Sequence, residues 1–152
     1  MTANQLTLIP RKNQDAEFAN VDVDTLTVGG VDYKAVPKDV LIKSADYTLV
    51  AADSGKTIFV TGVDKVFTLP ATVAGLKYTF VLKNAGLSAG TGLSISPAAA
   101  DFITGNGLTA VDNKDLILAG SGDRAGDCVI IEADGVDGWF ITSIIGTWSK
   151  EA

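Results

Sequence analysis

The chain has 152 residues, about one domain's worth of sequence. It contains no histidine and one cysteine, Cys128, which excludes Ser-His-Asp and Cys-His catalysis, imidazole metal ligands, an intrachain disulfide and a zinc–cysteine cluster. The net charge of −6 and the pI of about 4.4 argue against nucleic acids and anionic membranes as partners. With 47% hydrophobic and 20% charged residues, the composition is that of a packed domain rather than a disordered chain.

The N-terminal part, residues 1–37, has few large apolar side chains, and we predict an extended arm that ends in a short β-hairpin. The two-glycine connection Gly29-Gly30 is typical of a ribbon that turns back on itself. The strands that it joins carry Leu26, Val28, Val31 and Tyr33. A disordered tail is the alternative for residues 1–20, since chain ends are often loose.

The body, residues 38–152, contains short runs rich in β-branched and aromatic residues, separated by clusters of Gly, Asp, Asn and Ser. We expect strands at Tyr47–Val50, Thr57–Val60, Val66–Leu69, Tyr78–Lys83, Leu93–Ser96, Leu108–Val111, Leu116–Leu118, Cys128–Ala133 and Trp139–Ile145. This spacing predicts an all-β fold, an antiparallel sandwich or jelly-roll-like domain. The one helical start is Ser96–Ala100, where Ser would cap and Pro97 would take the first helical position.

Several of these strands are apolar on both faces. Tyr78, Phe80 and Leu82 share one face with Val81 opposite, and Phe140 and Ile144 are expected opposite Trp139 and Ile141. The runs 58–60, 116–118 and 129–131 have no polar position at all. A sheet with one face in water should alternate apolar and polar residues. The pattern therefore favours outer faces that are buried against other subunits, with central strands under covering loops as the alternative.

Two glycine-rich segments invite comparison with phosphate-binding loops. In Gly120–Gly126 the last glycine stands one position too far for a dinucleotide fingerprint, and a predicted strand follows where a helix is required. The segment 86–92 lacks the Gly-Lys-Ser/Thr ending of a phosphate loop and is interpreted as a hairpin loop. Neither segment predicts a nucleotide site, and no cofactor is expected.

Carboxylates cluster in the predicted loops as Asp22 with Asp24, Asp112 with Asp115, and Asp134 with Asp137. Such groups could bind calcium or form a glycosidase pair, but Asp and Gly are also the preferred turn residues, and no EF-hand spacing occurs. We interpret these residues as turn formers and predict no metal site. Cys128 is expected to be a small core residue, and the two tryptophans are expected in the core or at an interface rather than stacked on sugars.

Residues 41 to 148 resemble a recurring module of tailed-bacteriophage virion proteins. The matching stretches are Leu41–Leu49, Ala52–Lys56, Phe67–Ala71, Ala74–Phe80, Ile95–Asp101, Arg124–Asp127, Asp134-Gly135 ahead of Trp139, and Ile145–Trp148. The module is similar to those of capsid decoration proteins and of the ends of tail or head fibres. The resemblance implies an all-β, jelly-roll-like domain that forms trimers and has no catalytic activity.

Within that class the chain looks most like a decoration, or cement, protein. It starts at Met1 and has no shaft, heptads or repeats, so it is short for a fibre. An arm of 37 residues could span up to about 120 Å when extended. We expect a homotrimer on the outer capsid surface, made in the host cytoplasm and bound to the major capsid protein, with no nucleic-acid or membrane partner.

The expected roles of individual residues all lie in the arm and hairpin. The predicted capsid anchors are Leu6, Leu8, Ile9 and Phe18. The predicted intersubunit residues are Leu26, Val28, Val31 and Tyr33. The alternative function is a fibre-tip or head-fibre domain that binds host-surface glycans through loops such as 84–92 and 105–107. A third class, a polysaccharide-cleaving enzyme, would need a carboxylate pair in a cleft, for which Asp134 and Asp137 are the candidates.

Overall fold

A computed structural model of the chain describes residues 25–28, 31–34, 40–84, 92–119 and 122–152. Its contacts divide the chain into two compact units, Met1–Pro37 and Lys38–Ala152. In the first unit, β1 (Thr25–Val28) pairs antiparallel with β2 (Val31–Lys34). The hairpin expected from the Gly29-Gly30 connection is therefore present.

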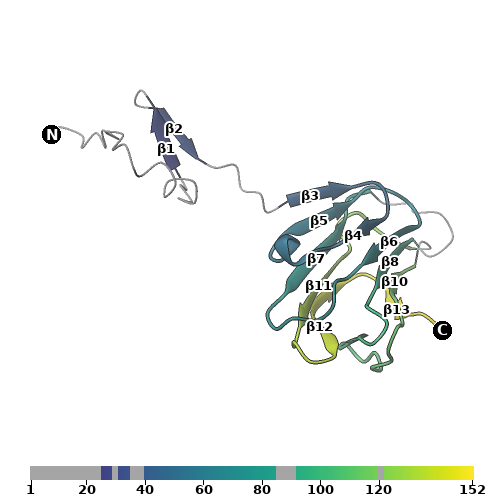
Figure 1. The fold of residues 1–152 in the computed structure, drawn as a ribbon. Helices are drawn as coiled ribbons and strands as arrows, with labels where there is room; N and C mark the ends of the chain where they lie inside the picture. Colours follow the sequence, from purple (N-terminus) through teal and green to yellow (C-terminus); the bar gives the residue numbers. More distant parts are fainter. Residues whose placement is uncertain (1–24, 29–30, 35–39, 85–91, 120–121) are drawn as a thin grey trace. The chain divides into compact units, whose positions relative to one another are not determined.

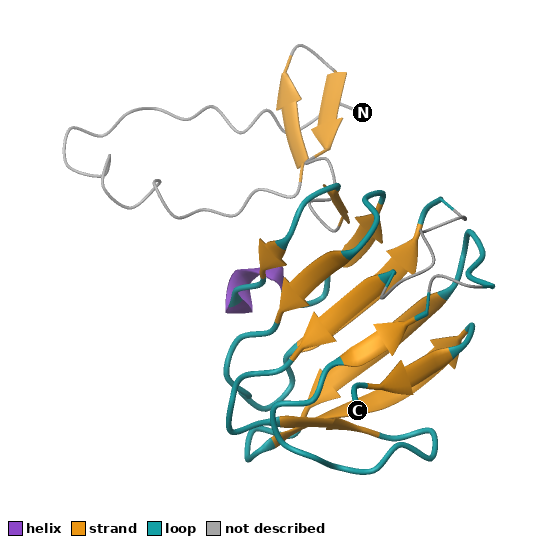
Figure 2. Ribbon diagram, turned by 90° about the vertical axis from the view of Figure 1, so that its right-hand side faces the viewer, coloured by secondary structure: helices purple, strands orange, loops and turns teal. Residues whose placement is uncertain are grey.

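The second unit consists of two β-sheets (Figure 1). The six-stranded sheet has the order β3 (Val40–Lys43), β5 (Thr57–Val60), β7 (Lys77–Leu82), β11 (Cys128–Ala133), β12 (Gly138–Ile145), β9 (Phe102–Thr104). The five-stranded sheet has the order β13 (Trp148–Lys150), β10 (Leu116–Leu118), β8 (Leu93–Ser96), β6 (Lys65–Thr68), β4 (Tyr47–Thr48). A 3-10 helix, Ala51–Asp53, lies between β4 and β5. The predicted all-β sandwich is confirmed, and loops connect the ends of its strands (Figure 2).

The chain crosses between the two sheets after every strand from β3 to β10. Neighbours within a sheet are therefore often two steps apart along the chain, and the strand between them supplies the crossover that a parallel pair requires. As a result β3, β5 and β7 run parallel to one another, as do β4, β6 and β8. The expectation of antiparallel sheets is wrong for these pairs and for β9 with β12. The remaining pairs in this unit are antiparallel, and the parallel pairs depart from a jelly-roll topology.

The core lies between the two sheets and is made by alternate residues of each strand. In β7, Tyr78, Phe80 and Leu82 are buried while Val81 points to the outer face, as the sequence predicts. The ring of Phe80 meets that of Phe67 edge to face, with centroids 5.6 Å apart. The other buried apolar residues are Leu49, Ile58, Val60, Leu69, Leu76, Leu93, Ile95, Ile103, Leu116, Leu118, Val129, Ile131, Ala133 and Trp139.

Some local expectations are wrong. Leu108–Val111 forms no strand, and this segment makes an isolated bridge between Gly105 and Leu108. Ser96–Ala100 forms no helix, because Ser96 ends β8 and the Asp101 amide closes a turn on the Ala98 carbonyl at 2.8 Å. Three strands were not expected from the sequence: β3, β9 and β13.

The side chains of β12 also point in directions that differ from the expectation. The register between β11 and β12 shifts between Ile130 and Ile131, so that the alternation of β12 is interrupted. Ile144 consequently packs against the core on the same side as Ile141, whereas Phe140 remains on the outer face, 41% exposed. A bulge of this kind cannot be recognised from apolar periodicity alone.

Candidate interaction surface

The outer face of the six-stranded sheet carries a continuous row of apolar side chains. Residues paired in register on adjacent strands point to the same face, and the pairs are Ile42 with Phe59, Phe59 with Val81, Val81 with Cys128, and Cys128 with Ile145. We call these five residues the apolar row. It crosses five neighbouring strands, from the edge strand β3 to β12.

The apolar row is most exposed at its two ends. Ile42 on β3 is 62% exposed and Ile145 on β12 is 59% exposed, whereas the three middle residues are half-buried between their neighbours. Single exposed apolar residues are ordinary on a protein surface, but a contiguous strip is typical of an interaction site. Four of the two-faced strands noted in the sequence, β5, β7, β11 and β12, therefore share this sheet, whereas the run 116–118 forms β10 of the other sheet.

The rows on one side of the apolar row contain few charges. One neighbouring row consists of Val40, Thr57, Thr79, Ile130 and Ser143, which pair in the same way. The next contains Lys77 and Glu132, whose Nζ and Oε2 atoms lie 3.7 Å apart. The apolar row and the row beside it thus carry no formal charge, and the following row carries an ion pair.

The outer face of the five-stranded sheet has a different character. Its central row is Val66, Ser94, Ile117 and Ser149, again in register. The Ser94 hydroxyl donates a hydrogen bond to Asp115 at 2.5 Å. Polar and apolar positions alternate across this row, so that the continuous apolar strip is a property of the six-stranded sheet.

Cys128 lies in the middle of the apolar row, which corrects the expectation of a core cysteine. The next residue, Val129, is fully buried, so the alternation of β11 directs Cys128 to the outer face, where it is half-buried. The thiol faces outward because Val129, Ile131 and Ala133 occupy the inward positions. An apolar run without a polar residue does not reveal which alternate set faces inward.

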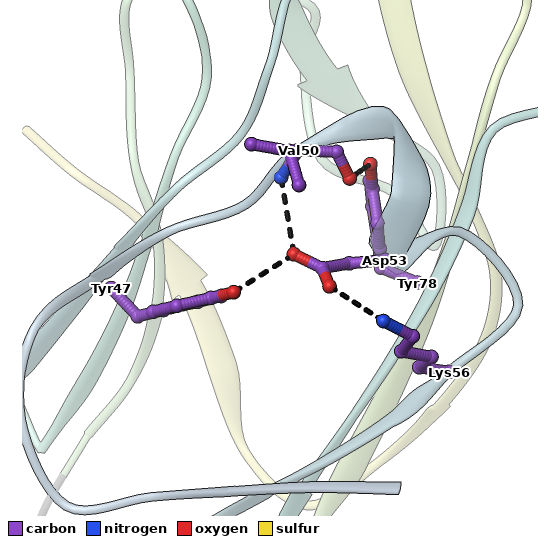
Figure 3. Close-up of polar contacts among 5 residues, drawn as sticks. All are labelled: Tyr47, Val50, Asp53, Lys56 and Tyr78. Atoms are coloured by element: carbon purple, nitrogen blue, oxygen red, sulfur yellow. Dashed lines mark hydrogen bonds and ion pairs between the residues drawn. The ribbon is translucent and has the colours of Figure 1, made fainter. Parts of the chain in front are cut away.

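The turn between β4 and β5 is held by the buried carboxylate of Asp53, which is 4% exposed (Figure 3). It accepts hydrogen bonds from Lys56 Nζ at 2.8 Å, the Tyr47 hydroxyl at 3.0 Å and the Val50 amide at 3.2 Å. The Tyr78 hydroxyl donates to the Val50 carbonyl at 2.9 Å. These contacts hold the chain where it crosses from one sheet to the other.

The same contacts shift three pKa values. Burial of Asp53 opposes ionisation, but hydrogen bonds from Lys56, Val50 and Tyr47 outweigh it and lower the pKa of this carboxyl group. The hydrogen bond to Asp53 raises the pKa of Tyr47. Burial, with a smaller contribution from the charge of Asp53, raises the pKa of Tyr78 to about 12. All three shifts arise from groups that fix this turn.

Other carboxylates that the sequence singles out also bind the backbone. Oδ1 of Asp134 accepts hydrogen bonds from the amides of Val136, Asp137 and Gly138 at 2.8, 3.3 and 3.2 Å. The bond from Val136 is the largest influence that lowers the pKa of Asp134. Asp134 therefore acts as a turn former, as the sequence indicates. In the described residues, His, Cys, Asp and Glu form no group of three or more that could hold a metal ion.

The glycine-rich segment before β11 leads into a strand, as expected, and not into a phosphate-binding helix. The Arg124 amide donates to the buried carboxylate of Asp127 at 2.8 Å, and the Gly126 amide donates to the Leu82 carbonyl at 2.8 Å. A shallow depression of about 450 Å³ lies over this turn and has Ile145 in its lining. The depression therefore adjoins one end of the apolar row.

The predicted residues of the arm and hairpin all belong to the first of the two units. The predicted anchors Leu6, Leu8, Ile9 and Phe18 lie outside the described residues. Leu26 pairs with Tyr33, and Val28 pairs with Val31, across the β1–β2 hairpin. The intersubunit role of these four residues stays a prediction. Sequence reasoning missed the apolar row itself, although the signal that could have found it is the set of runs without a polar face.

No protein-family model and no curated protein sequence matches this chain. Among the described residues, no helix is long and apolar enough to cross a membrane.

Proposed function

We propose that this chain is a non-enzymatic virion protein of a tailed phage, a decoration protein that binds the outside of the assembled capsid as a trimer and stabilises the shell. The observation that carries the proposal is the uncharged apolar row, because a contiguous apolar strip on a protein surface is typical of a site that contacts another protein. The resemblance to the virion module and the arm that precedes the body support the same assignment.

A structural role also fits the use of the polar side chains. Among the described residues, three carboxylates are buried: Asp53, Asp101 and Asp127. Each accepts a hydrogen bond from a backbone amide within the body. The chain has no histidine that could act as a base near neutral pH. These groups stabilise turns, which is what a protein selected for packing and association requires.

The proposed mechanism is thermodynamic. A protein that binds the assembled shell, and not the dissociated capsid subunits, stabilises the shell by RT ln(1 + [L]/Kd), about 2.7 kcal/mol for each site at a hundredfold excess over Kd. Three linked copies add effective concentration, so that individually weak contacts hold the trimer on the shell. The acidic charge would keep the free protein soluble before it binds.

Co-sedimentation of the full chain with purified, expanded capsids of its phage tests the proposal. We expect saturable binding to the capsids, a higher disruption temperature of the decorated shell, and no comparable binding to host cells. Saturable binding to host cells or to their purified surface glycans, without capsid binding, would instead support the fibre-tip function and overturn the decoration function.

A further inference from the structure

We infer that a second copy of this chain packs on the outer face of the six-stranded sheet, over the apolar row. This inference deepens the proposed function, on which it rests for the expectation of an oligomer. It assigns the contact between subunits to Ile42, Phe59, Val81, Cys128 and Ile145, in addition to any contribution from the hairpin.

The apolar row is a continuous surface. The five side chains lie in register on adjacent strands, so no polar strand interrupts the strip. Adjacent strands are about 4.8 Å apart, which gives the row a length of about 19 Å between its first and last strands. A strip of this length can meet a flat element of another subunit along its whole extent, which scattered apolar residues cannot do.

The lack of net charge on these rows suits contact with another copy of the same chain. Each copy has a net charge of −6, so two copies repel one another unless the contacting faces lack net charge. The apolar row and the row of Thr57 and Thr79 beside it contain no charged residue. The adjoining Lys77 and Glu132 neutralise each other at 3.7 Å. These rows therefore add no local charge repulsion when a second acidic copy approaches, and they offer no acidic surface to a strongly basic partner.

The apolar row begins at an edge of the sheet. The strand β3 is an edge strand, and its two outward residues, Val40 and Ile42, are 50% and 62% exposed. Edge strands of soluble proteins normally carry charges or other protection against pairing with another chain. The apolar outward residues of β3 indicate that a neighbouring subunit covers this edge together with the face.

Sedimentation velocity and light scattering of the full chain between about 1 and 100 μM test this inference, because typical specific contacts associate in or below this range. We expect a concentration-dependent oligomer for the unmodified chain. Ile42→Lys and Ile145→Lys place a charge at exposed ends of the row and should weaken association at least about tenfold. Val73→Lys and Val136→Lys, which are 57% and 79% exposed but lie outside the row, are matched controls and should leave association unchanged.

Cys128 provides a second readout that needs no substitution. It is the only cysteine of the chain and lies at the middle of the row, so its reaction with Ellman's reagent reports whether the row is covered. We expect the rate to fall at least about tenfold as the unmodified chain associates, in proportion to the fraction covered. In Ile42→Lys the fast rate should persist at high concentration. This measurement remains informative if a lysine variant folds poorly.

Two outcomes would overturn the inference: a chain that stays monomeric up to about 100 μM, well above the Kd of a specific interface, or an oligomer that both row variants leave intact with Cys128 still reactive. Capsid binding is measured separately on the same samples. Capsid binding by a persistent monomer would refute this inference and the trimeric state, and would leave binding to the capsid standing. An oligomer that is held together by the row but does not bind capsids would support this inference and overturn the decoration function.

Discussion

The ammonium group of Lys56 lies 2.8 Å from Oδ1 of Asp53, inside the turn that carries the chain from the five-stranded sheet to the six-stranded sheet. Asp53 is nearly inaccessible to solvent, so its charge depends on this contact and on the donors at its other oxygen. A buried carboxylate that kept its charge without such donors would strongly destabilise the fold. The turn and the crossover between sheets therefore depend on a few polar atoms.

Replacement of Asp53 by Asn should lower the free energy of unfolding at pH 7 by about 1–3 kcal/mol, because an amide cannot replace the charge-assisted hydrogen bond from Lys56. Urea denaturation measures the change. Asp64→Asn removes the same charge at an exposed position and should have little effect. Equal stability of Asp53→Asn and the unmodified chain would show that the contacts in Figure 3 do not hold the turn.

The acid stability of the chain should depend on the same residue. The pKa of Asp53 is lower in the folded protein than in the unfolded chain. Its contribution is therefore complete above the unfolded pKa, about 4, and is lost as the pH falls through the folded pKa. Between pH 7 and pH 3, the unmodified chain should lose more stability than Asp53→Asn. Titration of the other carboxylates is common to both proteins and cancels in the comparison.

The stability contributed by the Tyr78 hydroxyl should be lost at high pH, whereas that of Asp53 is lost at low pH. Its pKa is raised to about 12, whereas in the unfolded chain it is about 10. The contribution of this group is present below pH ~10 and is lost as the pH rises towards 12. Tyr78→Phe should be about 1 kcal/mol less stable at pH 7, because the Val50 carbonyl loses its donor. The difference should shrink by pH ~11, and a difference that stays constant in urea denaturation would contradict this account.

The sequence predicted the elements of this fold better than their connections. The apolar runs at 57–60, 93–96, 116–118 and 128–133 form strands with the expected bounds, because a short run of β-branched and other apolar residues between turn residues is a local signal. The choice of sheet for each strand is not a local property. Since the chain alternates between sheets, β5 meets β3 and β7 in parallel, a relationship that no short segment contains.

The interaction surface was only partly predictable for the same reason. Runs such as 129–131 indicated that some outer faces are apolar, but the residues that share a row depend on the register between strands. Cys128 illustrates the difference: its apolar neighbours suggested a core position, and the inward alternation of Val129 places it on the surface. The arm anchors rested on composition, and they lie outside the described residues.

Two glycines with the same backbone conformation provide a matched test of the loops. Gly55 and Gly135 both have φ of +82°, but a β-carbon on Gly55 would meet nothing within 4 Å, whereas one on Gly135 would lie 2.5 Å from the Ala74 nitrogen. Gly55→Ala should cost about 1–2 kcal/mol for the left-handed conformation alone. Gly135→Ala should cost about 1–3 kcal/mol more, because backbone must move to relieve the clash. Thermal unfolding compares them, and equal losses would refute the close contact of Gly135 with Ala74.

Lys150 fastens the strand β13 to the edge strand β9 of the opposite sheet and to the loop that follows β9. Its Nζ atom donates hydrogen bonds to the carbonyls of Ile103 and Thr109, each at 2.6 Å. Burial lowers the pKa of this ammonium group. The unfolded chain therefore holds the proton more tightly than the folded protein does, and the stability contributed by this residue rises as the pH approaches the unfolded pKa, about 10.4.

Lys150→Met keeps the length of the side chain but leaves the carbonyls of Ile103 and Thr109 without their donor. We expect a loss of about 1.5–3 kcal/mol at pH 7, since both hydrogen bonds come from a charged group. The difference from the unmodified chain should grow as the pH rises from 8 towards about 10, because only the unmodified chain gains stability as Lys150 loses its proton. Urea denaturation measures both effects, and hydrogen exchange should show faster opening of residues 148–150. Lys83→Met, at an exposed site, is the control, and an equal effect of the two substitutions would show that the fastening by Lys150 contributes nothing.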